Sequence, residues 1–340
     1  MSHSLTTRDF ATAVQPAAAG ERPVTRVAVL DDYQSVASHF AEWASLPEPS
    51  EVQFFDDHQA DEAALVARLA AFDVVVAMRE RTPFTRSLLQ QLPKLRLLVT
   101  TGMRNASIDV TAAVALGITV SGTDGLPYPT AELTWGLILA LARKISAEDR
   151  AIREGRWQTT LGVGLQGKTL ALLGLGRLGT QVARFGAAFG MQVIAWSPHL
   201  TAERAATGGA ELVARDELFQ RADVLSIHLV LSERTRGLVG ASELALLKRQ
   251  TLLINTSRGP LVDEAALIAA LASEKIAGAA LDVFDREPLP AGHPLLALEN
   301  TVLTPHLGYV TEETYRVFYS QALEDIQGHL AGKPLRVLSA

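Results

Sequence analysis

The sequence predicts an α/β protein built from two doubly wound parallel sheets. Three observations carry this prediction. Short apolar runs alternate with longer amphipathic runs, a pattern typical of parallel strands joined by helices that cover both faces of a sheet. The length of 340 residues suggests about two domains. A glycine-rich turn between residues 174 and 179 opens a second series of alternating runs.

The first series begins at residue 24, after an Ala-, Thr- and Ser-rich stretch, 1–23, that we expect to be a mobile extension. Hydrophobic periodicity identifies the elements, Asp61 and Glu62 favour a helix start, and Pro93 ends a helix. The predicted strands are 24–32, 52–55, 73–78 and 95–100, and the predicted helices are 33–44, 61–70, 85–92 and 108–115.

The second series follows a Gly/Pro loop at 123–129 and a long predicted helix at 130–152. A last helix, 311–330, can return to the first series. The predicted strands between them are 170–173, 192–196, 224–227, 251–255, 279–284 and 302–304, and the predicted helices are 180–189, 241–247 and 263–273.

Gly174, Gly176 and Gly179 form a G-x-G-x-x-G motif between a predicted strand and a predicted helix. The first glycine suits a tight turn, the second lets a phosphate approach the backbone, and the third lets helix and strand pack closely. The free N–H groups and the positive dipole end of the helix would then attract a pyrophosphate. The motif therefore predicts a dinucleotide-binding Rossmann domain.

Domain organisation follows from this motif. We expect the Rossmann domain to occupy residues 125–308 and to be inserted into a smaller domain made of 24–124 and 309–340.

Composition excludes several classes of function. The chain has a formal net charge of −6 and no basic block, which argues against nucleic acid and membrane surfaces as partners. It has no cysteine, which excludes disulfides, thiolate catalysis and Cys-ligated zinc, and no metal site is expected. No apolar run reaches the ~18 residues of a membrane span, and no signal peptide is recognisable, so we expect a cytoplasmic protein.

Three segments that end predicted strands of the second series carry reactive side chains. They are Asn255–Pro260, Asp282–Pro288 and Thr304–Gly308. Ligands of open α/β sheets bind beyond the carboxyl ends of the strands. Arg258, Glu287 and His306 can therefore converge near the reactive end of a bound dinucleotide.

From Arg26 onward, the order of these motifs resembles the D-isomer-specific 2-hydroxyacid dehydrogenases, which are NAD(P)-dependent. The resemblance implies that Arg258, Glu287 and His306 are catalytic and that the active site lies in a cleft between two domains. It also implies that the smaller domain, 24–124 and 309–340, is a flavodoxin-like substrate domain. It also implies hydride transfer between NAD(P)H and a small 2-keto or 2-hydroxy acid.

The chemistry agrees with these roles. Reduction of a 2-keto acid requires a proton at the carbonyl oxygen, which histidine can deliver near neutral pH. A neighbouring Glu287 would favour the imidazolium form of His306 and orient its ring. Arg258 offers a planar fork of donors to the substrate carboxylate, and its charge polarises the carbonyl.

The resemblance assigns further residues to the cofactor. Asp282 would accept the nicotinamide amide, although it is also a plausible turn residue, and His228 would border the cofactor or simply bond to backbone. The full predicted cofactor set is Gly174, Gly176, Arg177, Leu178, Gly179, Ser197, His228, Thr256, Asp282 and Gly308.

The resemblance also places a substrate-binding loop at Gly102, Met103 and Arg104, where backbone N–H groups would hold the substrate carboxylate. This loop departs from the family pattern at Met103 and Arg104. Arg104 could add a positive charge for a larger or diacidic substrate, or it could pair with a surface acid.

Two other functions stay open. One is a dehydrogenase of another small anion, such as formate or phosphite; the other is a dinucleotide-sensing binding protein without turnover. The intact Arg258, Glu287 and His306 favour the enzyme. We also expect a homodimer formed through the helix at 130–152, because the breadth of its apolar side chains, including Trp135, Leu137 and Leu139, requires burial.

The choice between NAD and NADP is not resolved. Ser197 stands where NAD-preferring members of the family usually carry Asp, and no arginine follows directly to clamp a 2′-phosphate. We predict that Ser197→Asp shifts the ratio of kcat/KM values toward NAD, because a carboxylate repels a 2′-phosphate. An unchanged ratio for the two cofactors would show that this position is not the selector.

Overall fold

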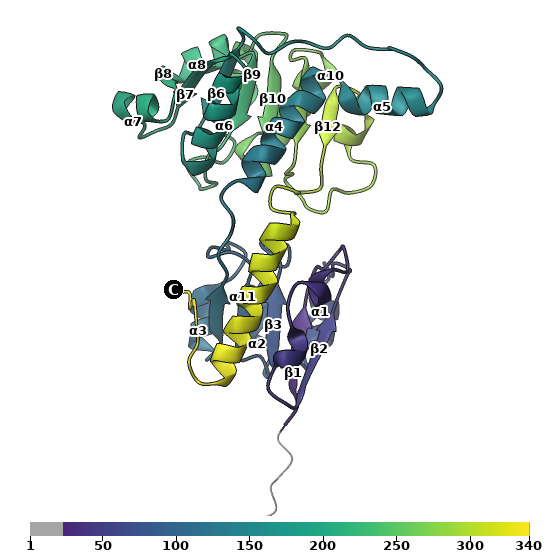
Figure 1. The fold of residues 1–340 in the computed structure, drawn as a ribbon, viewed down its shortest axis with the longest axis vertical. Helices are drawn as coiled ribbons and strands as arrows, with labels where there is room; N and C mark the ends of the chain where they lie inside the picture. Colours follow the sequence, from purple (N-terminus) through teal and green to yellow (C-terminus); the bar gives the residue numbers. More distant parts are fainter. Residues whose placement is uncertain (1–22, 340) are drawn as a thin grey trace, which may run out of the picture.

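The computed structural model describes residues 23–339 and consists of two lobes stacked along the long axis of the molecule (Figure 1). The predicted extension, 1–23, lies outside the described residues except for Pro23. The lower lobe is built on a five-stranded parallel sheet in the order β2-β1-β3-β4-β5. Its strands are β1 (Thr25–Val29), β2 (Ser50–Phe54), β3 (Val74–Ala77), β4 (Leu97–Thr100) and β5 (Thr119–Gly122).

The upper lobe is built on a seven-stranded parallel sheet in the order β12-β11-β10-β9-β6-β7-β8. The strand order reverses beside β6, which is the point where doubly wound sheets bind dinucleotides. Its strands are β6 (Thr169–Leu173), β7 (Gln192–Trp196), β8 (Glu211–Leu212), β9 (Val224–Ile227), β10 (Leu252–Asn255), β11 (Gly278–Leu281) and β12 (Thr301–Leu303).

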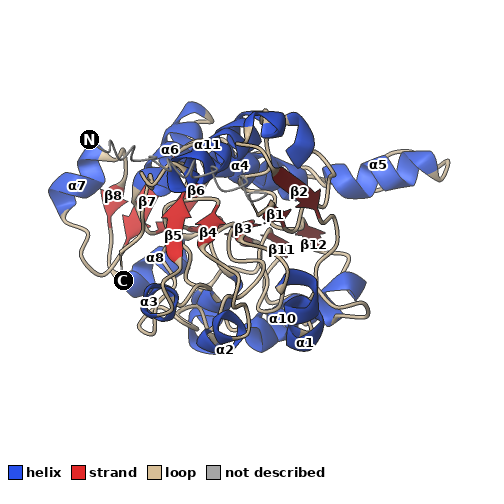
Figure 2. Ribbon diagram, turned by 90° about the horizontal axis from the view of Figure 1, so that it is seen from below, coloured by secondary structure: helices blue, strands red, loops and turns tan. Residues whose placement is uncertain are grey.

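Helices cover both faces of each sheet, as Figure 2 shows from below. In the lower lobe, α1 (Glu62–Leu69), α2 (Arg86–Gln90) and α3 (Val110–Ala115) cover one face and α11 (Glu312–Leu330) the other. In the upper lobe, α8 (Arg215–Arg221), α9 (Ala241–Leu246) and α10 (Glu264–Ala272) cover one face. The other face is covered by α4 (Pro129–Ala142), α6 (Arg177–Ala188) and α7 (Ala202–Thr207).

The chain passes from the lower to the upper lobe before α4 and returns through α11. Phe318 and Tyr319 of α11 are completely or almost completely buried against β1, β3 and β4. The C-terminal helix therefore belongs to the lobe that contains the N-terminal strands. The predicted α/β fold is confirmed: a Rossmann lobe is inserted into a flavodoxin-like lobe.

Two predicted helices were wrong. Residues 33–44 form only the 3₁₀ turns Ala37–His39 and Trp43–Ser45. The Asp32 carboxylate accepts the N–H groups of Val36 and Ala37, so side-chain bonds replace those of a helix.

The helix expected at 130–152 is broken. It forms α4 and α5 (Ile145–Arg153), separated at Lys144, whose φ of 56° is left-handed. The apolar part remains on the upper sheet, while α5 projects away from it (Figure 1). Strands β5 and β8 and helices α7 and α8 were not predicted. Within residues 23–339, no helix has the length and apolarity needed to cross a membrane.

Candidate active site

The centre of the candidate site is a hydrogen bond between a histidine and a glutamate. His306 follows β12 and Glu287 follows β11, and the His306 Nδ1 atom lies 2.7 Å from the Glu287 Oε2 atom. The backbone N–H of Phe284 donates to the other carboxylate oxygen of Glu287. Burial would raise the pKa of Glu287, but the bond and charge of His306 outweigh it, and the pKa lies below its usual value. Glu287 is therefore a carboxylate at neutral pH.

Asp282 holds the loop that carries His306. Its Oδ1 atom accepts the Thr304 hydroxyl and the Leu307 N–H, and its Oδ2 atom accepts the Gly308 N–H at 2.9 Å. The residue is fully buried, and burial raises its pKa in spite of these bonds. The geometry favours the turn-forming role of Asp282, while its contact with a nicotinamide amide stays a prediction.

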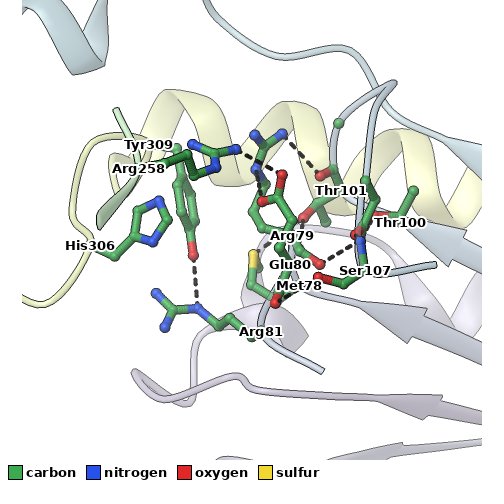
Figure 3. A network of polar contacts seen from close by, with 12 residues as sticks. Met78, Arg79, Glu80, Arg81, Thr100, Thr101, Ser107, Arg258, His306 and Tyr309 are labelled. Atoms are coloured by element: carbon green, nitrogen blue, oxygen red, sulfur yellow. Dashed lines mark hydrogen bonds and ion pairs between the residues drawn. The ribbon is translucent and has the colours of Figure 1, made fainter. Parts of the chain in front are cut away.

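Arg258 points from the end of β10 toward the lower lobe. One terminal nitrogen donates to the Ser257 carbonyl and the other to the Glu80 Oε1 atom, at 2.7 Å each. Glu80 follows β3, so this ion pair joins the two lobes (Figure 3). Burial would raise the pKa of Glu80, but the charges of Arg258 and Arg79 dominate and lower it.

A contact within the lower lobe lies beside the histidine, at the junction with the upper lobe. Arg81 donates from Nε to the Tyr309 hydroxyl at 2.8 Å, and the Tyr309 ring meets the His306 ring edge-on, with centroids 5.6 Å apart (Figure 3). The Arg81 guanidinium also stacks on the Tyr33 ring, 4.9 Å from its centroid. Burial raises the pKa of Tyr309, so its hydroxyl keeps its proton. The imidazole of His306 is therefore packed between Glu287 and a fixed aromatic ring.

The glycine turn fits a dinucleotide. Gly174 has a φ of 104°, and a Cβ atom there would lie 2.6 Å from the His228 carbonyl oxygen. A Cβ at Gly179 would overlap the Gly174 carbonyl oxygen. At Gly176 a Cβ would meet nothing within 4 Å, so this N-cap of α6 is open to a phosphate, with Arg177 exposed beside it and Leu178 half-buried.

The remaining predicted cofactor residues differ in which of their atoms are free to bind a ligand. The Nδ1 atom of His228 is buried without a hydrogen-bond partner, and burial lowers the pKa of His228 to about 4, so the ring is neutral. An orphaned polar atom beside the glycine turn fits a bound polar ligand. Ser197 is half-buried after β7. The Thr256 hydroxyl is instead buried against the Thr134 hydroxyl at 2.7 Å, which leaves only the Thr256 backbone for a cofactor.

The predicted substrate loop lies at the lower edge of the junction. The Gly102 N–H already donates to the Thr123 hydroxyl, so it is not free for a carboxylate, contrary to the prediction. Within residues 23–339, the N–H groups of Met103 and Arg104 have no backbone or side-chain acceptor. The Arg104 side chain is exposed and forms no ion pair in the same range. Asn105 ties this loop to the Arg79 carbonyl.

Sequence reasoning missed Glu80 and Tyr309. Glu80 stands between two cations in the run Arg79-Glu80-Arg81, which directly follows a predicted strand. Tyr309 follows the segment that contains His306, but its partner Arg81 is 228 positions away. Contacts between residues so far apart in the sequence become visible only in the folded chain.

The fold and the site together define a dinucleotide-dependent oxidoreductase. The glycine turn, at the point where the strand order of the upper sheet reverses, fits NAD or NADP. The His306–Glu287 pair and the remaining hydrogen-bond donors of Arg258 lie at the junction of the lobes. Comparisons with known proteins identify the family.

Residues 135–308 match the model of the D-isomer specific 2-hydroxyacid dehydrogenase, NAD binding domain. The chain is 44% identical over 256 residues to the glyoxylate reductase of Aeropyrum pernix, covering 72% of this chain and 76% of that protein. It is 40% identical over 273 residues to the D-3-phosphoglycerate dehydrogenase of Methanocaldococcus jannaschii, covering 79% of this chain but only 52% of the relative. The structure of a phosphoglycerate oxidoreductase from Vibrio cholerae O395 matches with a TM-score of 0.86 and 37% identity, covering 91% of this chain and 99% of that chain.

The chain belongs to the D-isomer-specific 2-hydroxyacid dehydrogenase family. It is an NAD(P)-dependent oxidoreductase of the class that transfers hydride between 2-hydroxy acids and 2-keto acids.

Two glycine variants separate the fold of the turn from its function. Gly179→Ala forces a Cβ into the Gly174 carbonyl, so we expect a lower Tm without cofactor and a loss of NAD(P)H binding. Gly176→Ala meets open space, so we expect an unchanged Tm but at least ~10-fold weaker binding, because the methyl group occupies the approach of the phosphates. Differential scanning fluorimetry and NADH fluorescence titration measure both effects. Full binding by Gly176→Ala would contradict this assignment.

Proposed function

We propose that the protein reduces a small 2-keto acid to the corresponding D-2-hydroxy acid at the junction of the two lobes. The observation that carries this proposal is the 2.7 Å bond between His306 and Glu287, which follow neighbouring strands. We further propose that residues 24–124 and 309–340 form the substrate-binding domain and 125–308 the cofactor-binding domain. The separate sheets, with strands inside 25–122 and 169–303, support this division.

The roles of the side chains follow from their chemistry. Arg258 binds the substrate carboxylate and polarises the carbonyl with the donors that Ser257 and Glu80 leave free. His306 uses Nδ1 toward Glu287, so its Nε2 atom delivers the proton to the carbonyl oxygen. Glu287 stabilises the imidazolium and fixes the ring. When bound, the nicotinamide supplies the hydride.

The N–H groups of Met103 and Arg104 complete the proposed carboxylate site from the lower lobe. The glycine turn, Ser197, His228 and Gly308 would hold the cofactor from the upper lobe. The family supports NAD or NADP, and the preference between them stays a prediction, as does the cytoplasmic location.

The acid–base assignment predicts a signed pH effect. Reduction needs a proton on His306, and Glu287→Gln removes the carboxylate whose pKa is lowered by the bond and the charge of His306. This interaction is mutual, so its loss weakens the hold on the proton. We therefore expect reductive kcat/KM for glyoxylate to fall off at a lower pH in Glu287→Gln than in the wild type. His306→Gln should lower kcat by about 10²–10⁴-fold at every pH.

A matched control is Asp285→Asn, an exposed acid two residues from Glu287, whose pH profile should equal that of the wild type. An identical profile for Glu287→Gln would contradict the pairing. Tight NAD(P)H binding without turnover of any 2-keto acid would instead indicate a dinucleotide sensor.

We also propose a homodimer, formed through the C-terminal part of the segment 130–152 that the sequence indicated and the residues that follow it. Trp135 and Leu137 are 8% and 3% exposed and belong to the core of the upper lobe, contrary to the expectation for these side chains, whereas Leu139 is half-buried and borders the surface described below. The apolar side chains that do face solvent lie on α5 and the extended segment that follows it. They include Ile145 (53% exposed), Ile152 (53%), Trp157 (75%) and Leu161 (93%).

This projecting arm (Figure 1) supports the dimer because its side chains line an open cavity of about 730 Å³. A second copy would bury the arm and the cavity together.

The dimer is tested by changing the arm alone. Trp157→Ser combined with Leu161→Ser removes exposed apolar area without touching either core, so we expect monomers with an unchanged fold. Light scattering after size exclusion gives the mass, and circular dichroism gives the fold. The control Glu203→Gln, an exposed acid on α7 outside the arm, should remain dimeric. If the double variant remained dimeric, the interface would have to lie outside the arm.

A further inference from the structure

Glu80 is a carboxylate beside the proposed substrate-binding arginine, and the mechanism above does not use it. Its side chain is 20% exposed, and its Oε1 atom accepts from Arg258 at 2.7 Å. Its Oε2 atom is buried without a hydrogen-bond partner and lies 3.8 Å from Arg79 Nε, which also lacks a partner. Figure 3 shows the Glu80 carboxylate between the two guanidinium groups.

The charge of Glu80 is permanent at neutral pH, because Arg258 and Arg79 lower its pKa against the effect of burial. A substrate whose carboxylate binds Arg258 therefore lies within a few ångströms of a second carboxylate. In a half-buried site, a like charge at that distance weakens binding by about tenfold or more.

The charges around Arg258 match a substrate that carries one negative charge. Arg79 and Arg258 contribute two positive charges and Glu80 one negative charge, which leaves a net charge of +1. A 2-keto acid with one carboxylate neutralises this group. A second carboxylate or a phosphate on the substrate would have no partner in it. Arg104 is exposed on the adjacent loop, which Asn105 ties to the Arg79 carbonyl, and it is a cation that could compensate such a group.

We propose that Glu80 is a specificity-determining residue that restricts the site to 2-keto acids with a single negative charge. It disfavours substrates with a distal carboxylate or phosphate by repulsion. This inference rests on the proposed function, since it needs Arg258 to bind the substrate carboxylate.

The test compares 2-oxobutyrate with oxaloacetate, which differ in a distal methyl against a distal carboxylate. We expect wild-type kcat/KM to favour 2-oxobutyrate by at least ~10-fold and Glu80→Gln to reduce that preference by about tenfold. Glu80→Asp keeps the charge and should keep the preference. The ratio cancels any general loss of activity that follows from changing a partner of Arg258.

Two controls separate this charge effect from others. Glu203→Gln, an exposed acid on α7, should leave the ratio unchanged. Arg104→Met removes the positive charge that could bind a distal anion, and it should change the ratio less than Glu80→Gln does. A wild-type preference for oxaloacetate that disappears in Arg104→Met would overturn the proposal, as would an equal ratio in wild type and Glu80→Gln.

A binding measurement separates failure of this inference from failure of the proposed function. D-malate and D-2-hydroxybutyrate are titrated against the protein with NAD(P)⁺, and ligand-induced shifts of Tm are recorded. Absence of turnover with every keto acid would refute the proposed function. Even then, Glu80→Gln should improve binding of D-malate relative to D-2-hydroxybutyrate by about tenfold, and an unchanged ratio would refute the role of Glu80.

Discussion

The site depends on one buried carboxylate. Asp282 follows β11 and accepts three hydrogen bonds from the segment that follows β12. His306 lies in the middle of that segment with a φ of 56°, a left-handed conformation that costs a non-glycine residue about 1–2 kcal/mol. The surrounding bonds must offset this strain. Without Asp282, the N–H groups of Leu307 and Gly308 would lose their acceptors, at about 1–3 kcal/mol for each group left buried and unpaired.

The electrostatics of the junction are arranged so that each charge has a partner. Arg258 pairs with Glu80, and Glu287 pairs with His306. Arg81 has no carboxylate within ion-pair distance among residues 23–339 and uses the Tyr309 hydroxyl and the Tyr33 ring instead. Because these groups are only partly exposed, solvent screens them less than it screens surface pairs. Groups contributed by both lobes thereby fix their side chains before a substrate arrives.

The sequence predicted most of this framework. Periodicity located the main strands of both sheets because fully buried strands read as continuous apolar runs, such as Val74–Val76. It failed at 33–44, where Asp32 supplied local acceptors, and at Lys144, where a left-handed residue interrupts a helix-like pattern. Neither the side-chain bonds of Asp32 nor the left-handed backbone of Lys144 alters the spacing of the apolar residues in the sequence. The short strands β5 and β8 were missed because runs of four and two residues give too little periodicity.

Much of the site was also predictable from the sequence, and the residues that were missed have a structural reason in common. Glu287, His306 and Asp282 all follow strands of the upper sheet, so one fold motif brings them together and the sequence could pair them. The neighbours of Arg258 and Tyr309 both come from the loop after β3 in the lower lobe. The contact of Arg258 depends on how the two sheets face one another, and the contact of Tyr309 joins the two ends of the chain within the lower lobe.

This division has a functional consequence. The proposed proton-transfer pair lies within one lobe, so the bond between His306 and Glu287 does not require contact with the other lobe. The groups that are proposed to surround the substrate carboxylate belong to both lobes, and a loop such as 79–81 can change without disturbing either sheet. In the proposed mechanism, reactivity and selectivity are therefore encoded in different parts of the chain. The upper lobe supplies the histidine and the glutamate, while the loops of the lower lobe set the charge that the substrate must carry.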